Sequence, residues 1–281
     1  MYEPQVTIIT PTYNVVDNSQ VNDFDLMITM LGKQTYSFLD LLVIDNNSKD
    51  GTVDLLKEYK NEGSLAFYSE PDQGKFDAIN KGLVRAKGKY VAFLSCDDFY
   101  HDIKAIENVV NFMEEEEADF CCFPSYCCQP DGSAFLFEPA ILNTFQVVPC
   151  PRQAVIFRKE ALQELGYFDA KFKLLADYDL IIRLILNGYA GVQWGDTLVT
   201  TKLGEKVNRY TTQAEAEFSH IFHKNFKTMY PMNEEVLERM VKISEIPRPL
   251  LDQLAQYFPD EEQEEFYQRY ENMYNFRVQN S

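Results

Sequence analysis

The segment FLSCDD, residues 93–98, ends an apolar run in two adjacent carboxylates, Asp97 and Asp98. Neighbouring carboxylates repel each other and lose hydration together, so the pair is costly unless a cation or solvent compensates for it. A divalent metal ion is one source of compensation, and solvation at the end of a strand is the other. Taken alone, the six residues favour solvation, because Asp-Asp pairs are common in loops.

Two more carboxylates, Asp177 and Asp179, open an amphipathic segment that spans residues 177–186. Side chains two residues apart on a helix point about 200° apart, so at most one of them can face a given crevice. A carboxylate within hydrogen-bond reach of a hydroxyl can act as a general base, and a favourable contact with the helix dipole is the structural alternative. Asp179 also lies four residues before Arg183, the spacing that favours an ion pair.

Alternating strands and helices are predicted to position these groups. Short apolar runs predict strands at residues 6–10, 41–44, 65–68 and 90–94, with helices between them at residues 24–31, 52–59 and 78–85. Such alternation is typical of βαβ units in a mostly parallel sheet with helices on both faces. We therefore expect an α/β fold.

Polar residues follow each of the four predicted strands. They occupy residues 10–14 (TPTYN), 45–48 (DNNS), 70–74 (EPDQG) and 97–98 (DD). In an open parallel sheet, ligands bind outside the carboxyl ends of the strands. The convergence of four polar segments on that edge favours a functional site over simple solvation of Asp97 and Asp98.

The pattern changes after about residue 115. Pro130-Asp131-Gly132 predicts a hairpin, residues 155–157 a strand, and residues 159–165 a helix closed by Gly166. From about Thr212 the chain shows little strand signal. Its aromatic stripe of Phe266, Tyr267, Tyr270 and Tyr274 is expected to pack on the domain, while a membrane-surface face and a homodimer contact stay open as alternatives.

Composition limits the classes of partner. The 281 residues carry 44 acidic and 26 basic side chains, a formal net charge of −18, which argues against nucleic acid as a ligand. An anionic ligand would need local positive charge, which a bound divalent ion could supply. No apolar window is long enough to span a membrane and no secretory signal opens the chain, so we expect a cytoplasmic protein with at most peripheral contact at the inner face of the membrane.

Four of the six cysteines form a CC-x4-CC pattern at residues 121–128. Adjacent cysteines on a strand point to opposite faces and do not easily converge on one ion, so small buried thiols are favoured over metal ligands.

Four ordered blocks give the chain a resemblance to a known family. VTIITPTYN, LLVIDNNSKDGT, SEPDQGKFDAINKGLVRAKGKYVAFLSCDD and GYFDAKFKLLADYDLIIRLILNG resemble the family 2 glycosyltransferases, over about residues 5–200. The resemblance implies the GT-A nucleotide-sugar-binding fold. The third block is similar to the branch that builds bacterial surface polysaccharides and lipopolysaccharide.

The resemblance also implies roles for particular residues. Those implied to surround the nucleotide are Thr10, Pro11, Tyr13, Asp45, Asp72, Gly74 and Asp97, with Asp45 at the base edge. Asp97 corresponds to the carboxylate that binds Mg²⁺ or Mn²⁺ between the phosphates, with Asp98 beside it, and Asp177 corresponds to the catalytic base. Turn bracing by Asp45 or Asp72 is the alternative reading of those two carboxylates.

Two positions depart from the family pattern. Ser95 stands where many relatives have an aspartate, which leaves the first carboxylate of the metal motif unassigned. Pro151-Arg152-Gln153 stands where relatives of this branch tend to have His before Gln. Arg152 is therefore expected to contact the acceptor or a phosphate, or else to be a surface cation.

We expect a metal-dependent inverting glycosyltransferase that moves a hexose or N-acetylhexosamine from a UDP-sugar to a hydroxyl of a glycan or lipid-linked saccharide. A GT-A domain would span residues 1–211, with a donor half to about residue 100 and an acceptor half beyond it, followed by a helical appendage over residues 212–281. A sugar nucleotidyltransferase is disfavoured because TPTYNVVDN lacks a glycine-rich basic loop, and an oxidoreductase because no GxGxxG follows the first strand. A non-catalytic nucleotide-sugar-binding module would not need Asp177.

Overall fold

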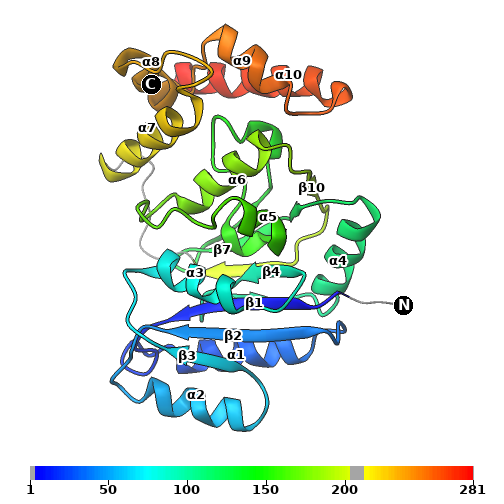
Figure 1. Ribbon diagram of the computed structural model, residues 1–281, viewed down its shortest axis with the longest axis vertical. Helices are drawn as coiled ribbons and strands as arrows, with labels where there is room; N and C mark the ends of the chain where they lie inside the picture. The colour runs from blue at the N-terminus through cyan, green and yellow to red at the C-terminus, as the bar shows by residue number, and fades with distance from the viewer. Residues whose placement is uncertain (1–3, 203–211, 281) are drawn as a thin grey trace.

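The computed structural model describes residues 4–202 and 212–280. Its main sheet has the strand order β10-β6-β9-β4-β1-β2-β3 (Figure 1). The strands are β1 (Val6–Thr12), β2 (Leu39–Asp45), β3 (Ala66–Ser69), β4 (Tyr90–Phe93), β6 (Phe120–Cys122), β9 (Val155–Arg158) and β10 (Gly191–Gln193). Pairs β1–β2, β2–β3, β1–β4 and β10–β6 are parallel, whereas β9 runs antiparallel to both β4 and β6. The predicted α/β fold with a mostly parallel sheet is confirmed, with β9 as an antiparallel insertion.

Helices cover both faces of this sheet. The elements are α1 (Val21–Gly32), α2 (Thr52–Asn61), α3 (Lys75–Arg85), α4 (Ala105–Glu115), α5 (Lys159–Glu164) and α6 (Ala176–Leu186). Apolar residues of α1, α2 and α4 form one core cluster with one face of the sheet, and those of α3, α5 and α6 form a second cluster with the other face. Gly82 permits the close approach of α3 to β1, because a Cβ atom there would lie 2.4 Å from Cγ2 of Ile9.

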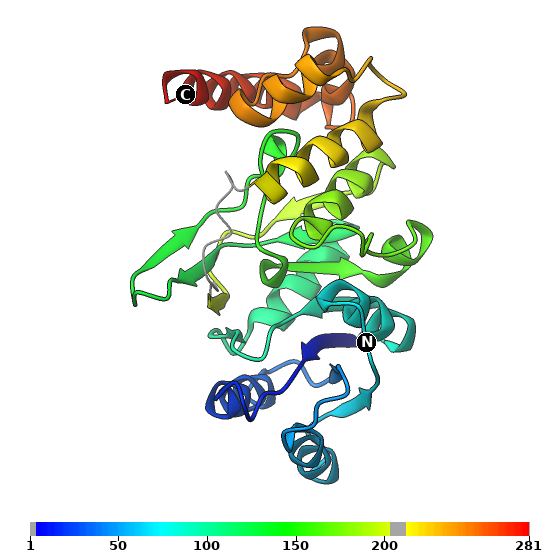
Figure 2. The same cartoon turned by 90° about the vertical axis from the view of Figure 1, so that its left-hand side faces the viewer.

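A second, smaller sheet has the order β5-β11-β7-β8. It comprises β5 (Phe99–Tyr100), β7 (Ser125–Cys128), β8 (Ala134–Phe137) and β11 (Val199–Lys202). Strands β7 and β8 form the hairpin predicted at Pro130-Asp131-Gly132, and it projects from the body of the molecule (Figure 2). Five of the six cysteines are buried and all six are free, as expected for structural thiols.

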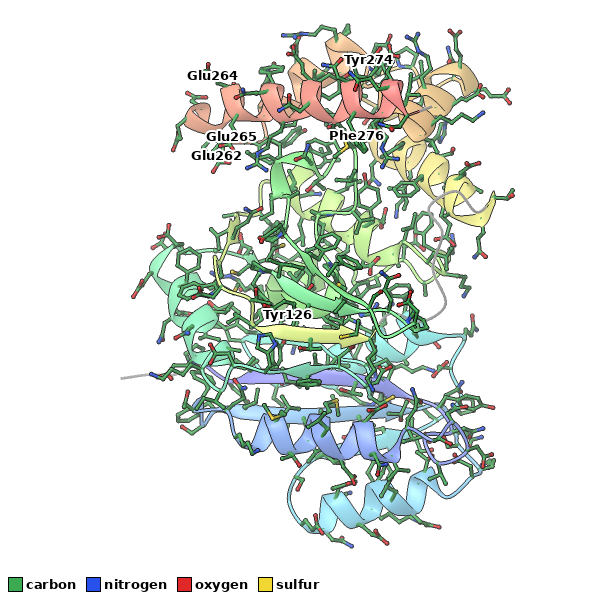
Figure 3. All side chains as sticks on the ribbon, turned by 180° about the vertical axis from the view of Figure 1, so that it is seen from behind. Tyr126, Glu262, Glu264, Glu265, Tyr274 and Phe276 are labelled. Atoms are coloured by element: carbon green, nitrogen blue, oxygen red, sulfur yellow. The ribbon has the colours of Figure 1, made fainter. Side chains whose placement is uncertain are left out.

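The C-terminal part is helical, as predicted. It consists of α7 (Thr212–Phe226), α8 (Glu234–Ile243), α9 (Arg248–Ala255) and α10 (Asp260–Gln279). Phe266 of α10 is buried, and its ring lies 6.3 Å from that of Phe145, which agrees with packing of the aromatic stripe on the domain. Figure 3 shows Glu262, Glu264 and Glu265 toward one end of α10, and Tyr274 and Phe276 toward the other.

The proposed domain boundary after residue 211 falls at residues 203–211, outside the described residues. Across the described ranges, no helix combines the length and apolar character that a membrane span needs.

Candidate active site

Polar segments after β1, β2 and β3 meet at one edge of the main sheet. The register sets Asp45 beside Thr12 on one side and beside Ser69 on the other, so these strands end at the same level. Three hydrogen bonds then join the segments: Asn14 N to Ser48 Oγ at 2.8 Å, Glu70 N to Asp45 O at 2.9 Å, and Asp72 N to Asn46 Oδ1 at 2.8 Å. Three of the four polar segments that were expected to converge are therefore joined by hydrogen bonds at this edge.

Asp45 is the last residue of β2 at this edge, and its side chain is fully buried. Its carboxylate accepts hydrogen bonds from Ser48 N at 3.0 Å, Ser48 Oγ at 2.5 Å and Ser69 Oγ at 2.6 Å. A buried carboxylate needs such donors to offset the loss of hydration. The turn-bracing role weighed as an alternative is thus observed, and the side chain is not exposed at the edge in the way a contact to a nucleotide base requires.

The three residues expected around the base and ribose differ in exposure. Tyr13 is 57% exposed and offers an aromatic face, while Pro11 is half-buried. Thr10 is fully buried, and its hydroxyl lies 3.7 Å from Sδ of Met27. A direct nucleotide contact is therefore open to Tyr13 and Pro11, whereas Thr10 supports the strand beneath them.

Asp72 and Gly74 form the turn that leads into α3. The Asp72 carboxylate accepts a hydrogen bond from Gly74 N at 2.8 Å, and burial raises the pKa of Asp72 above its ordinary value. Gly74 precedes the first residue of α3 with a φ of 123°, a backbone conformation that favours glycine. The turn exposes the amino-terminal end of α3, whose first residue is Lys75.

Asp97 and Asp98 are adjacent in the chain but differ in burial and in hydrogen bonding. Asp98 is fully buried and accepts hydrogen bonds from Ser95 N at 2.8 Å, Gln153 Nε2 at 2.8 Å and Lys202 N at 3.1 Å. It ties three segments of chain together, so the expectation that it is an exposed metal ligand does not match its geometry. Asp97 is only half-buried, and burial followed by repulsion from Asp98 raises the pKa of Asp97 to about 6.

A divalent ion at Asp97 would have few protein carboxylates as ligands, because the neighbouring Asp98 is fully buried. Among residues 4–202 and 212–280, no group of three or more His, Cys, Asp or Glu side chains is placed to hold a metal. This donor set suits Mg²⁺ or Mn²⁺ bound together with phosphate oxygens and waters, because such ions are often held by one or two carboxylates and a substrate. The half-buried carboxylate of Asp97 therefore fits a metal that arrives with a nucleotide.

Asp177 is paired with Arg152. Nη1 of Arg152 lies 3.7 Å from Oδ2 of Asp177, and the two side chains are 8% and 20% exposed. The Nε of Arg152 is buried and has no hydrogen-bond partner in the described part of the chain, while its guanidinium lies 5.7 Å from the Phe76 ring centroid. The interpretation of Arg152 as a surface cation is therefore wrong.

Lys75 is a second cation beside the Phe76 ring, with its Nζ 4.7 Å from the ring centroid. Burial lowers the pKa of Lys75, and repulsion from Arg152 lowers it further, although the side chain still reaches solvent. Lys75 and Arg152 are therefore two protein cations near Asp177 that could attract an anionic ligand in addition to a bound divalent ion. This pair could not be predicted from local pattern, because Lys75 and Arg152 are 77 positions apart and the fold brings them together.

Residues 152 and 153 join the two carboxylate sites. They belong to the short 3-10 helix η2 (Arg152–Ala154), in which Arg152 contacts Asp177 and Gln153 contacts Asp98. Gln153 was not singled out from the sequence as a site residue. Its side chain fixes the turn that carries Asp97, so the proposed metal ligand and the proposed base are held by adjacent residues.

Asp179 has the structural role expected of it. It is fully buried, and its Oδ2 lies 2.8 Å from Nε of Arg183, which confirms the predicted ion pair. Lys224 of α7 also binds its carboxylate at 3.0 Å. As predicted for residues two apart on a helix, Asp179 faces inward while Asp177 remains partly open.

Comparison with known proteins gives a family match and several relatives. The model of the family described as glycosyl transferase family 2 matches residues 7–165, more than half of the chain. A PGL/p-HBAD biosynthesis glycosyltransferase of Mycobacterium bovis (strain BCG / Pasteur 1173P2) is 27% identical over 193 residues, covering 66% of this chain and 72% of that protein. The glycosyltransferase TuaG of Bacillus subtilis (strain 168), named for teichuronic acid biosynthesis, is 36% identical over 121 residues, covering 42% of this chain and 46% of that protein.

Solved structures show the same fold. S. aureus TarS 1–349 in complex with UDP-GlcNAc superposes with a TM-score of 0.61 at 16% identity, covering 91% of this chain and 82% of that chain. A mannosyltransferase from Pyrobaculum calidifontis in complex with GDP-Man and Mn²⁺ has a TM-score of 0.62 at 18% identity, covering 91% and 72%. At these identities the likeness concerns the fold, which is the GT-A fold expected from the sequence blocks.

Proposed function

The chain belongs to glycosyl transferase family 2, and from this membership we propose that it moves a hexose or N-acetylhexosamine from a UDP-sugar to a hydroxyl of a bacterial surface-glycan precursor. The relatives named for PGL/p-HBAD biosynthesis and for teichuronic acid biosynthesis support this class of product. The acceptor would be a glycan or a lipid-linked saccharide, used on the cytoplasmic side of the membrane.

The donor would bind along the edge formed by the segments after β1, β2 and β3. Tyr13 and Pro11 are the exposed residues that would contact the base and ribose, with Thr10 and Asp45 holding the strands beneath them. Asp72 and Gly74 would shape the pocket at the start of α3, where backbone N–H groups and the helix dipole favour an anion.

Asp97 would hold Mg²⁺ or Mn²⁺ together with the diphosphate, and Asp98 would fix the turn. The ion would supply charge neutralisation for the departing nucleoside diphosphate. Lys75 and Arg152 would share this task near Asp177, because both cations lie over the Phe76 ring.

Asp177 would act as the general base that takes the proton of the acceptor hydroxyl. Arg152 would orient its carboxylate through the pair at 3.7 Å. With one base on the face opposite the leaving group, the sugar would be transferred with inversion at the anomeric carbon. The observation that carries the proposal is the link through Arg152 and Gln153, which holds the Asp97 turn and Asp177 from adjacent residues.

We further propose that residues 1–211 form the transferase domain, with a donor half to about residue 100 and an acceptor half beyond it, and that the helices after residue 211 form an appendage.

A panel of nucleotide sugars tests the proposal. The purified protein should release UDP from at least one of UDP-glucose, UDP-galactose and UDP-N-acetylglucosamine when Mn²⁺ is present, and Asp177→Asn should abolish most of that release. Binding of UDP without turnover of any donor, with or without lipid-linked acceptors, would instead favour the non-catalytic binding module.

A further inference from the structure

The start of α6 is held by a carboxylate from the C-terminal helices. Glu217 of α7 accepts three successive backbone hydrogen bonds, from Lys173 N at 3.0 Å, Leu174 N at 3.0 Å and Leu175 N at 2.9 Å. Leu175 directly precedes α6 and its side chain provides no cap, while Asp177 is the second residue of the helix. Backbone N–H groups at a helix start need partners from outside the helix, and here a distant helix supplies an anion just before it.

A second set of contacts joins α7 to the same turn of α6. Asn225 Nδ2 donates to Asp179 Oδ1 at 3.0 Å, next to the ion pair that Lys224 makes with this carboxylate. The rings of Tyr178 and Phe218 pack edge to face at 5.3 Å. Tyr178 and Asp179 directly follow Asp177 in the chain, and Figure 2 shows α7 lying along α6. Helix α7 therefore fixes both the backbone before Asp177 and the side chains after it.

The same segment reaches the proposed donor pocket. Nζ of Lys173 donates a hydrogen bond to the backbone oxygen of Gln73 at 3.2 Å. Gln73 lies between Asp72 and Gly74 in the turn before α3. The residue whose N–H is bound by Glu217 thus also contacts the turn that would bind the diphosphate.

We propose that Glu217 is a positioning residue for Asp177 and that α7 is part of the catalytic architecture. This inference rests on the proposed function, in which Asp177 is the base. Hydrogen bonds to an ionised carboxylate are stronger than neutral ones, so three of them fix the segment 173–175 firmly. A displacement of about 1 Å at a catalytic group can cost a hundredfold in rate. Helix α7 would then contribute no reacting group itself but would position one.

Hydrogen exchange tests the positioning without any ligand. Glu217→Gln keeps the shape of the side chain but removes its charge and turns one acceptor into a donor. Amide exchange in a peptide covering residues 173–178 should become at least about tenfold faster, the factor for loss of one charge-assisted hydrogen bond. Glu215→Gln, the same change two residues away on α7, should leave that peptide unchanged. Equal exchange in wild type and Glu217→Gln would overturn the proposal.

A double-mutant cycle tests whether Glu217 acts through Asp177. UDP release with Mn²⁺ and the best of the three UDP-sugars should fall about tenfold or more in Glu217→Gln, with UDP affinity unchanged. In the Asp177→Asn background the same substitution should have little further effect, because the group it positions is already lost. Independent, additive losses would mean a general structural role and would overturn the proposal. If Asp177→Asn itself kept normal turnover, the assignment of the base would fail, while hydrogen exchange would still decide whether Glu217 fixes the segment.

Discussion

Gln153 donates a hydrogen bond from Nε2 to Oδ2 of Asp98 at 2.8 Å, and Asp98 belongs to the turn that carries Asp97. This contact places a neutral amide, instead of a cation, against a fully buried carboxylate. The burial raises the pKa of Asp98, which the hydrogen bonds from Gln153 and the backbone partly offset. The turn at the end of β4 thus depends on a residue 55 positions away.

Gln153→Ala should lower the free energy of unfolding by about 1–3 kcal/mol, because it leaves part of a buried carboxylate without a donor. Urea unfolding measures this, with Gln163→Ala on the exposed side of α5 as the control. Metal-dependent UDP binding should weaken in the first variant and stay unchanged in the second. A stable Gln153→Ala protein with normal UDP affinity would show that the contact does not hold the turn.

Asp97→Ala should weaken UDP binding in Mn²⁺ by about tenfold or more while leaving the fold intact, since it removes the half-buried carboxylate proposed to bind the metal. Titration calorimetry with Mn²⁺ and with EDTA measures the effect. Asp54→Ala, which removes the same charge from an exposed position on α2, is the control. Lys75 and Arg152 should sustain some residual affinity in EDTA. Equal UDP affinity with Mn²⁺ and with EDTA in the wild type would contradict a role for metal in donor binding.

Asp177→Asn and Asp179→Asn should separate catalysis from stability. The first should lower transfer by about a hundredfold or more, the scale for loss of a general base, with donor affinity nearly unchanged. The second should lower the free energy of unfolding by about 3–5 kcal/mol, because it breaks a buried charge cluster with Arg183 and Lys224. Near-normal turnover in Asp177→Asn together with collapse of turnover in folded Asp179→Asn would reverse the assignment.

Arg152→Lys should lower transfer by roughly ten- to a hundredfold, because an ammonium cannot reproduce a guanidinium that meets Asp177 and lies over the Phe76 ring. Steady-state kinetics with the best UDP-sugar measures the loss. Arg248→Lys, on an exposed part of α9, is the control for the substitution itself. Unchanged kinetics in Arg152→Lys would reduce the role of this residue to charge alone.

Phe266→Ala should lower the free energy of unfolding by about 3–5 kcal/mol, because it leaves a cavity between α10 and Phe145. Phe276→Ala on the same helix, where the side chain is 60% exposed, should change stability by less than about 0.5 kcal/mol. Thermal unfolding of both variants distinguishes the two faces of α10. Equal effects would mean that the helix does not use Phe266 to pack on the domain.

Local pattern in the sequence determined the fold class and the edge at which the site lies. Apolar runs of strand length followed by polar residues predicted β1, β2, β3 and β4, and a parallel sheet brings the carboxyl ends of such strands together. The pair Asp179–Arg183 and the opposite directions of Asp177 and Asp179 followed from helical spacing alone. These features are predictable because each depends on residues only a few positions apart.

Tertiary structure decided which polar residue does what. Asp97 and Asp98 are neighbours of the same type, yet Asp98 is fully buried and accepts hydrogen bonds from the distant residues Gln153 and Lys202, whereas Asp97 is half-buried. The cation beside Asp177 comes from η2, and the carboxylate that holds the start of its helix comes from α7, 40 positions further along the chain. Burial, hydrogen bonding and charge pairing act over a few ångströms of space, so the composition and periodicity of a segment cannot specify which distant residues will meet it.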